Sequence, residues 1–262
     1  MLIGDGTRAI VTGASRGIGR ATATALAGRG ARVGLLSRGA EELEALADQL
    51  GGDPVVLAAD VGERESVTAA IESFVEQAGG LELVVANAGM IHTAPFTELP
   101  IERAEQMVRV NVLGLLYTVK AALPHMLDHA TGHVVVISSA AALRAFPWAA
   151  TYGATKAADR AFAEALRHEL SGTGVSVTTV FPGEIATDLH AHEDRLADWL
   201  RPDDAIPPER AAEAIVRGID EDRRAVYVPG AVRALGLNAV APRLTDRLLA
   251  TLRGGTAAPR RD

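Results

Sequence analysis

The sequence predicts an α/β protein whose parallel sheet of about seven strands carries helices on both faces, a doubly wound arrangement. Two observations predict this fold. Short apolar runs recur along the chain, as expected of strands that are buried on both faces. Between them lie longer segments with helical spacing, several of which close near a glycine, where helices often end.

We expect the strands where the apolar runs lie, at residues 8–12, 32–37, 54–60, 81–87, 133–138, 175–181 and 224–230. Helical spacing predicts helices over residues 19–30, 40–51, 63–80, 149–170 and 207–219. The last of these helices begins with prolines, which suit a first helical turn because its amide groups have no partner within the helix.

Length and composition favour a single domain. The chain has 262 residues, 48% of them hydrophobic, which is enough for a sizeable core but too short for two ordinary domains and a linker. We expect the domain to cover residues 1–253, with a substrate lid near 184–207 and a helical extension at 231–253. Residues 254–262 are low in complexity and predict a disordered tail.

Charge and composition exclude several classes of function. The net charge is −7 at pH 7, and no basic cluster suits a nucleic acid. The absence of cysteine excludes disulfides and is compatible with a reducing cytoplasm. The chain does not begin with a signal-peptide pattern, and its longest uncharged stretch, around 130–143, is shorter than a membrane helix. We therefore expect a cytoplasmic protein with no transmembrane segment.

The stretch VTGASRGIG places Gly13, Gly17 and Gly19 between the first strand and the first helix. In such a turn the pyrophosphate of a dinucleotide can lie on backbone amides at the helix N-terminus, and side chains would hold it away. The alternative is a tight strand-to-helix turn without a ligand. The place of this turn near the amino end of a repeating strand–helix pattern favours a nucleotide site.

The end of the second strand bears on which nucleotide is bound. An NAD site usually has Asp or Glu there, about 20 residues after the glycines. Here the strand ends with Ser37 and Arg38, and no carboxylate is present. A hydroxyl and a guanidinium suit a 2′-phosphate, which Arg16 in the glycine turn could also reach. We expect NADP(H) as the preferred cofactor and NAD(H) as the alternative, in which both arginines are solvated surface residues.

Further motifs follow in order along the chain. They are TGASRGIG at 12–19, Asp60 after the third strand, NAG at 87–89, Asn111, Ser139 after the fifth strand, YGATK at 152–156, PG at 182–183 and Thr187. In this order and spacing they resemble the compact, single-domain short-chain dehydrogenases/reductases, from about residue 7 to about residue 230. The resemblance implies a Rossmann-like fold and an enzyme that interconverts an alcohol and a ketone or aldehyde with a nicotinamide cofactor.

The resemblance also implies a cofactor site. In it the NAG residues flank the adenosine ribose, Asp60 accepts from the adenine amino group, and Thr187 binds the nicotinamide carboxamide or a phosphate. The full expected set is Gly13, Ser15, Arg16, Gly17, Ile18, Gly19, Ser37, Arg38, Asp60, Val61, Asn87, Ala88, Gly89, Tyr152, Lys156, Pro182, Gly183 and Thr187.

Tyr152 and Lys156 are the predicted acid/base pair, four residues apart and therefore on one face of a helix. A free tyrosine has a pKa near 10, and a neighbouring cation favours the phenolate and moves that pKa toward the working range. The chain has two lysines against 24 arginines, and by resemblance the compact Lys156 ammonium also donates to the nicotinamide ribose. The alternative is an ordinary pair on a helix surface.

Ser139 and Asn111 complete the predicted catalytic set by resemblance. Ser139 would hold the substrate oxygen against Tyr152, whereas alternation along the strand should point Ser138 the other way. Asn111 would link a water, the backbone and Lys156 in a proton relay, and its alternative is a helix asparagine that is bonded locally. In reduction, Tyr152 would donate a proton to the substrate oxygen as hydride reaches the carbonyl carbon.

The substrate is the least determined part of the prediction. Phe146, Pro147 and Trp148 lie beside small alanines, which indicates an apolar cavity for a lipophilic or ring substrate. Equally, these residues and the leucines of the lid could bury the lid against the body. The leucines of the C-terminal extension could cover the pocket mouth, meet a partner subunit or lie on a membrane surface.

The expected partner is a small-molecule alcohol or carbonyl compound. By resemblance, a homodimer or homotetramer would form through the helices around 102–127 and 152–170. We expect no metal, because the histidines and acidic residues at 190–194 lie in a loop. The competing hypothesis is a non-catalytic nucleotide-sensing or scaffold protein. It predicts loss of Ser139, Tyr152 or Lys156, and all three are present.

Overall fold

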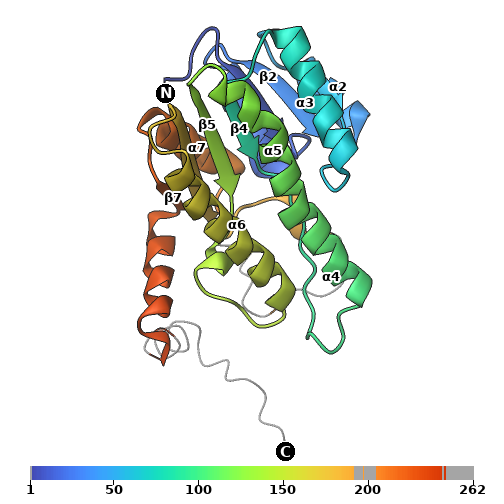
Figure 1. Ribbon diagram of the computed structural model, residues 1–262. Coiled ribbons are helices and arrows are strands. Elements are labelled where there is room, and N and C mark those ends of the chain that lie inside the picture. The colour runs from blue at the N-terminus through green and yellow to red at the C-terminus, as the bar shows by residue number, and fades with distance from the viewer. Residues whose placement is uncertain (1, 192–196, 198–204, 244, 246–262) are drawn as a thin grey trace, which may run out of the picture.

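The computed structural model describes residues 2–191, 197, 205–243 and 245. Seven parallel strands form one sheet in the order β3-β2-β1-β4-β5-β6-β7 (Figure 1). The α/β fold class with a doubly wound parallel sheet, predicted from the alternation of apolar runs and helical segments, is confirmed.

The strands are β1 (Arg8–Thr12), β2 (Arg32–Ser37), β3 (Val55–Ala58), β4 (Leu83–Ala86), β5 (Gly132–Ile137), β6 (Val175–Pro182) and β7 (Ala225–Val228). Strands β3 and β4 are shorter than the apolar runs that predicted them. Their last predicted residues, Asp60 and Asn87, leave the ladder: Asp60 accepts from the amide of Gly62 at 2.8 Å, and the side chain of Asn87 donates to the Thr12 carbonyl at 2.8 Å.

The helices are α1 (Gly17–Ala27), α2 (Ala40–Ala47), α3 (Arg64–Ala78), α4 (Ile101–Met107), the π-helical segment η1 (Val108–Leu113), α5 (Gly114–Leu127), α6 (Ala150–Glu169) and α7 (Pro208–Asp220). Short 3-10 helices are η2 (Ala140–Ala142), η3 (Asp188–His190) and η5 (Gly230–Ala239). As the glycine rule predicts, α3 ends at Gly79, whose φ of 79° is left-handed and whose amide donates to Val75.

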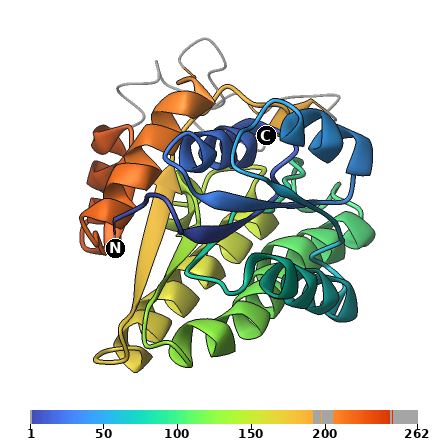
Figure 2. The ribbon, with the colours of Figure 1, turned by 90° about the horizontal axis from the view of Figure 1, so that it is seen from above.

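Helices cover both faces of the sheet, as the view from above shows (Figure 2). On one face, α1, α2 and α7 pack on the sheet through residues such as Leu26, Leu43 and Ile215. On the other face, α3, α5 and α6 pack through residues such as Phe74 and Val119. Neighbouring strand residues enter opposite cores, which is why the strands read as continuous apolar runs.

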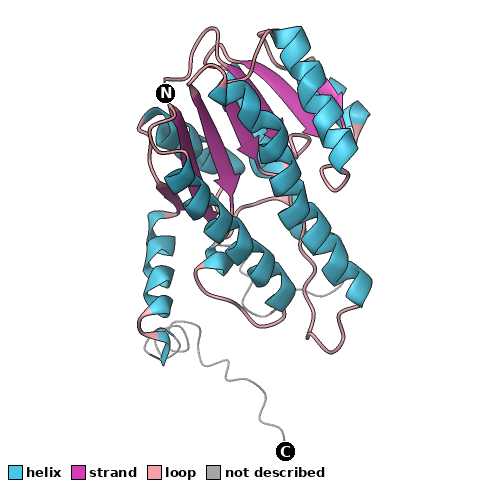
Figure 3. Ribbon diagram, in the orientation of Figure 1, coloured by secondary structure: helices cyan, strands magenta, loops and turns pink. Residues whose placement is uncertain are grey.

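The segments α4, η1 and α5 form one continuous helical stretch from Ile101 to Leu127 (Figure 3). By length and composition it could cross a membrane, with a mean hydropathy of 1.2 over an 18-residue window. Leu115, Val119 and Met126 of this stretch are buried against the sheet. We therefore interpret the stretch as a core helix of the α/β fold.

The strand order places a reversal point between β1 and β4. The chain proceeds from β1 to β2 on one side and from β4 to β5 on the other, so their following loops diverge and leave a crevice at the carboxyl ends of the strands. The glycine turn follows β1, and the NAG residues follow β4. The predicted nucleotide residues therefore border the crevice where open α/β sheets bind ligands.

Candidate active site

The turn between β1 and α1 is built by its glycines. Gly13 and Gly17 have φ of 67° and 56°, a left-handed conformation that other residues rarely adopt. Gly19 is buried, and its backbone packs so closely on Gly13 that a Cβ at Gly19 would lie 2.2 Å from the Gly13 carbonyl oxygen. This geometry brings the backbone of Ser15, Arg16 and Ile18 to the start of α1, where amides without helical partners can receive a phosphate.

Asn87 fastens this turn to the end of β4. Its side-chain amide donates to the carbonyl oxygens of Thr12 at 2.8 Å and Gly13 at 3.3 Å. In return, the Thr12 hydroxyl accepts from the amides of Asn87 at 3.0 Å and Ala88 at 2.9 Å. The side chain of Asn87 thus shapes the turn rather than projecting beside it.

The loop after β6 closes the turn from the other side. Pro182 ends β6, and the amide of Gly183 donates to Val228 at 2.7 Å. A Cβ on Gly17 would lie 3.0 Å from Cγ2 of Thr187, so Thr187 faces the glycine turn. Burial raises the pKa of Glu184.

The predicted lid is described at residues 184–191, 197 and 205–207. An isolated bridge joins Ile185 to Ile206, and the amide of Ala186 donates to Ile206 at 2.9 Å. The predicted lid residues Leu196, Trp199 and Leu200 lie outside the described residues.

Two exposed arginines lie in the loops that follow β1 and β2, where the resemblance predicts the adenosine part of a cofactor. Arg16 lies in the glycine turn and Arg38 follows β2, and neither guanidinium forms an ion pair with another described residue. Between them in sequence, the buried Ser37 hydroxyl lacks a hydrogen-bond partner among the described residues. Asp60 and Val61 follow the neighbouring β3. No carboxylate of the described residues therefore neutralises either guanidinium.

Tyr152 and Lys156 lie on α6, whose residues 150–169 include both as expected. Lys156 is buried, and its ammonium donates to the Ile137 carbonyl at 3.0 Å and to the Asp159 carboxylate at 2.9 Å. Burial by itself would lower the pKa of Lys156, but the charges of Asp159 and Tyr152 outweigh it, so the pKa is raised. Burial also raises the pKa of Asp159, against the opposing effect of Lys156. With its pKa raised, Lys156 keeps its proton and remains an ammonium beside Asp159.

Ser138 and Ser139 point in different directions after β5, as strand alternation predicts. The Ser138 hydroxyl is buried and donates to the Lys156 carbonyl at 2.8 Å. The Ser139 side chain is only partly buried and accepts from the amide of Ala141 at 3.1 Å. That bond leaves the hydroxyl hydrogen of Ser139 available to a substrate oxygen.

Asn111 lies in the π-helical segment η1 rather than in regular α-helix. Its side chain accepts from the amide of Met90 at 2.8 Å and donates to the Met90 carbonyl at 2.9 Å and to Thr155 at 3.0 Å. These bonds tie η1 to the loop after β4 and to α6. A Cβ on Gly89 would lie 3.5 Å from both Asn111 Oδ1 and Lys156 Nζ, so the three predicted residues meet.

An apolar cluster surrounds Tyr152. Its buried members come from the loop after β4, from α4, from η2, from the loop before α6 and from α6 itself, and are Ile91, Met107, Ala141, Phe146, Ala149 and Tyr152. Leu189 of η3 and Leu235 of η5 pack against it. Trp148, beside this cluster, has a φ of 66°, which is unfavourable for a bulky residue, and its carbonyl accepts from the amide of Ala94 at 3.0 Å.

Sequence reasoning missed two contributors to this site. Thr12 was quoted in the glycine motif but not assigned a role, and Asp159 was not singled out. The signal for Asp159 was its spacing, because a carboxylate three residues after Lys156 lies on the same helix face. Among the described residues there is no group of three His, Asp or Glu that could hold a metal, and His192, Glu193 and Asp194 lie outside them.

Comparison with known proteins agrees with this geometry. A family model described as short chain dehydrogenase matches residues 7–196. An uncharacterized oxidoreductase of Staphylococcus aureus (strain MRSA252) is 36% identical over 218 residues, which cover 82% of this chain and 91% of that protein.

Solved structures show the same fold. A short-chain dehydrogenase/reductase from Burkholderia phymatum in complex with NAD has a TM-score of 0.85 at 24% identity, covering 94% of this chain and 97% of that one. An alcohol dehydrogenase from the archaeon Thermococcus sibiricus complexed with 5-hydroxy-NADP has a TM-score of 0.76 at 30% identity, covering 84% and 94%. Because the matched segment holds both the glycine turn and the tyrosine–lysine helix that the fold brings together, the chain belongs to the short-chain dehydrogenase/reductase family.

Proposed function

We propose that this protein is an NADP(H)-dependent oxidoreductase that interconverts an alcohol and a ketone or aldehyde. The observation that carries the proposal is the meeting of Lys156, Asn111 and Gly89 at the crevice. Tyr152 lies one turn before Lys156 on α6, and Ser139 lies two residues after the last residue of β5, whose carbonyl accepts from Lys156. Tyr152 lies on the same face of α6 as Lys156 and is a buried member of the apolar cluster. The Ser139 hydroxyl accepts one hydrogen bond, so its own hydrogen can be donated to a substrate. An acid/base group, an orienting hydroxyl and a cation thus border one crevice beside a turn shaped for phosphates.

A nicotinamide dinucleotide fits the residues present. Gly19 packs directly against the Gly13 carbonyl and the Asn87 side chain, which keeps the turn tight, and the amides at the start of α1 have no helical partners and can receive a pyrophosphate. When bound, the cofactor supplies or accepts the hydride.

The residues of this chain handle the proton. In reduction, Tyr152 donates its phenolic proton to the substrate oxygen, which Ser139 holds by a hydrogen bond; in oxidation, the Tyr152 phenolate accepts that proton. The Lys156 cation stabilises the phenolate. A positioned acid or base of this kind typically contributes about 10² to 10⁴-fold in rate, and orientation of the reactants adds to it.

Two features support the finer assignments. The unneutralised guanidiniums of Arg16 and Arg38, without a carboxylate at the end of β2, favour the 2′-phosphate of NADP(H). The apolar cluster around Tyr152 favours a lipophilic or ring substrate. Leu189 and Leu235 join that cluster, so the start of the lid and the C-terminal extension would both wall the substrate pocket.

The first test is thermal unfolding with NADPH, with NADH and without either. A ligand at 100 times its dissociation constant stabilises the native state by about 2.7 kcal/mol. We expect NADPH to raise the melting temperature more than NADH. A larger rise with NADH would overturn the choice of cofactor, and no rise with either would favour a non-catalytic role.

The test of the chemistry is Tyr152→Phe, assayed by NADPH oxidation with a panel of apolar ketones. The variant lacks the transferable proton, so kcat should fall by at least about 10²-fold while NADPH still raises the melting temperature. Tyr227→Phe is the control, because Tyr227 stacks on Phe181 in β6 and β7, away from Lys156. Unchanged turnover in Tyr152→Phe would remove Tyr152 from the mechanism.

A further inference from the structure

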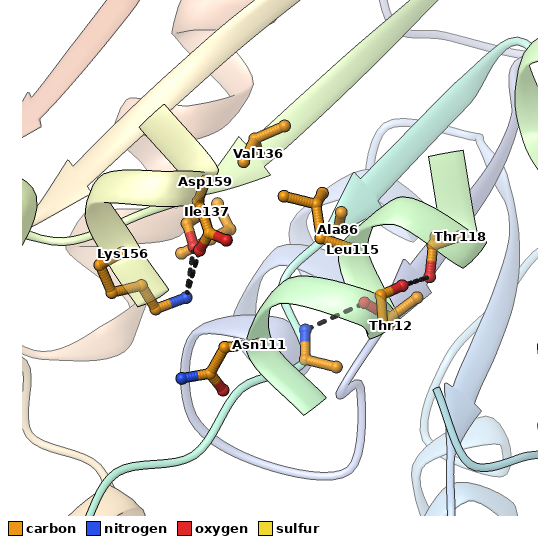
Figure 4. Close-up of a pocket in the computed structure, with 11 residues that line it drawn as sticks. Thr12, Ala86, Asn111, Leu115, Thr118, Val136, Ile137, Lys156 and Asp159 are labelled. Atoms are coloured by element: carbon orange, nitrogen blue, oxygen red, sulfur yellow. Dashed lines mark hydrogen bonds and ion pairs between the residues drawn. The ribbon is translucent and has the colours of Figure 1, made fainter. Parts of the chain in front are cut away.

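Lys156 and Asp159 form a buried ion pair inside the fold. Their side chains are 6% and 2% exposed, and Lys156 Nζ lies 2.9 Å from Asp159 Oδ2. The close-up in Figure 4 shows the two side chains pointing toward each other from α6. A buried pair of this kind is costly to desolvate, so its presence calls for a reason beyond stability.

The pair leaves Lys156 with one donor to spare. An ammonium has three N–H donors, and two are used by Asp159 Oδ2 and the Ile137 carbonyl. Gly89 lies beside the ammonium, where a Cβ would approach Nζ to 3.5 Å. The absence of a side chain at Gly89 keeps this approach open. The two buried acceptors therefore anchor Lys156 from within the fold and leave the third donor for a ligand in the crevice.

Within the part of the chain that the structure describes, no second carboxylate acts on Lys156 in place of Asp159. A cavity with about 10 Å³ available to the centre of a water molecule adjoins the pair (Figure 4). From β1, α5 and η1 it is faced by neutral polar groups, namely Thr12, Thr118 and Asn111. Its remaining lining, apart from the pair, consists of Gly114 and aliphatic residues of β4, the loop after it, α5 and β5. Among the described residues, Tyr152 and Asp159 are the titratable groups whose charges act on Lys156.

The second carboxylate oxygen of Asp159, Oδ1, is not used in the ion pair, and Asp159 is one of the residues that line the cavity. Asp159 Oδ1 is buried and has no hydrogen-bond partner among the described residues. A cavity of this size is at the limit for one water molecule. Such a water would satisfy Oδ1 and keep Asp159 ionised beside Lys156.

We propose that Asp159 is a positioning residue, which keeps Lys156 charged and directs its remaining donor toward the nicotinamide ribose. This inference rests on the proposed function, since it assigns Asp159 a part in cofactor binding by Lys156. A lysine buried among aliphatic groups would otherwise lose its proton readily and could then neither donate as a cation nor stabilise the Tyr152 phenolate.

The experiment measures NADPH affinity by fluorescence between pH 6 and pH 10 for the wild type, Asp159→Asn and Asp159→Leu. Asn keeps the shape and an acceptor without the charge, and Leu removes both. The control is Glu164→Gln, which neutralises an acid on the same helix that pairs with Arg224 at the surface. Thermal unfolding of each apo variant establishes that it is folded.

The expected result is a loss of NADPH affinity at alkaline pH that falls within this pH range in the Asp159 variants and not in the wild type. Without Asp159 the Lys156 ammonium should lose its proton at a lower pH, because burial lowers its pKa and the attraction of the Asp159 carboxylate no longer opposes it. Above that pH NADPH should bind about 10-fold more weakly, because a hydrogen bond from a charged donor is lost. Glu164→Gln should keep the wild-type profile. A folded Asp159→Asn variant with the wild-type profile would overturn the proposal and leave the oxidoreductase function standing.

If the single Asp159 variants do not fold, a double variant that removes both charges still tests the proposal. Asp159→Leu combined with Lys156→Met removes both charges and leaves neither buried without a partner, so this double variant should be folded more stably than either single change. Its NADPH affinity should match that of Lys156→Met, with no alkaline limb, if Asp159 acts through Lys156. Weaker binding by the double variant than by Lys156→Met would contradict the proposal. A wild type that binds neither NADPH nor NADH at any pH would overturn the proposed function instead.

Discussion

At the scale of single residues, several polar side chains of the site form hydrogen bonds with other protein groups rather than pointing toward a ligand. Thr12 and Asn87 bond to one another's backbone and fasten the glycine turn to β4. Asn111 joins Met90 to Thr155 in the same way. Because these polar groups satisfy one another, the crevice is shaped before a ligand enters it, and the cost of ordering on binding is small.

Arg38 gives the sharpest test of cofactor choice. Its exposed guanidinium follows β2 at the position where an NAD site has a carboxylate. Arg38→Ala should weaken NADPH binding by about 10- to 100-fold, the value of a charge-assisted hydrogen bond, and leave NADH binding almost unchanged. Isothermal titration with both nucleotides measures this. The control is Arg223→Ala, because Arg223 precedes β7 at the opposite, amino end of the strands. Equal losses of NADPH and NADH affinity in Arg38→Ala would show that Arg38 does not bind the 2′-phosphate.

Because His133 is buried, we expect the free energy of unfolding to fall at acid pH. This residue is fully buried in β5 and bonds to the Thr178 hydroxyl at 2.8 Å. Burial lowers the pKa of His133 to about 4, against the attraction of Asp222. Since the unfolded chain takes up the proton near pH 6.5, stability should fall as the pH drops from about 6.5 to about 4, by about 3 kcal/mol in all.

Urea unfolding at several pH values tests this contribution. His133→Val cannot take up a proton, so its stability should fall less steeply over the same pH range, whatever its stability at pH 7. Parallel curves for the wild type and the variant would show that His133 does not titrate in this window.

At the scale of elements, sequence periodicity predicted the strands and helices well and their ends less well. Strands β1 and β2 have the expected bounds, because charged or turn residues flank short apolar runs. The π-helical turn around Asn111 was not predicted, since one extra residue in a helical turn leaves no mark in a polar and apolar pattern. Such turns are frequent at functional sites, and here it carries Asn111 to Met90.

Gly34 tests how closely α3 packs on the sheet. It lies in β2, where a Cβ would be 2.7 Å from Cδ2 of the fully buried Phe74 and 3.0 Å from Cδ1 of Leu57. Gly34→Ala should therefore destabilise the fold by about 1 to 3 kcal/mol through overpacking. Chemical denaturation measures the change. Gly51→Ala, at a position with open space, should have little effect, and a neutral Gly34→Ala would show that the contact relaxes freely.

At the scale of the whole molecule, one sheet organises the site. The seven strands end at a common edge, so residues distant in sequence, from Gly13 to Thr187, border one crevice. The continuous stretch α4–η1–α5 lies on one face of this sheet and continues past it beside α6 (Figure 1). Its outward side carries apolar residues, among them Ile101, Val108 and Leu127, which are 60%, 42% and 39% exposed.

We expect this outward side, with α6, to form the interface of a homodimer or homotetramer. Exposed apolar residues that recur along one helical stretch favour association with a partner. Val108→Glu should therefore lower the molar mass measured by light scattering at micromolar concentration. Leu2→Glu, which changes an exposed residue near the N-terminus, is the control. A monomeric wild type would contradict the expectation.

The sequence by itself determined the properties that depend on local spacing. These are the alternation of strands and helices, the glycine turn, and the placing of Tyr152 and Lys156 on one helix face. Only the tertiary structure decided which groups those residues meet. The spacing on α6 brings Asp159 near Lys156, but only the packing of β5 and α5 against α6 buries the pair, and burial is a property of what packs from elsewhere in the chain. For the same reason Thr187 faces Gly17, although 170 positions separate them in sequence.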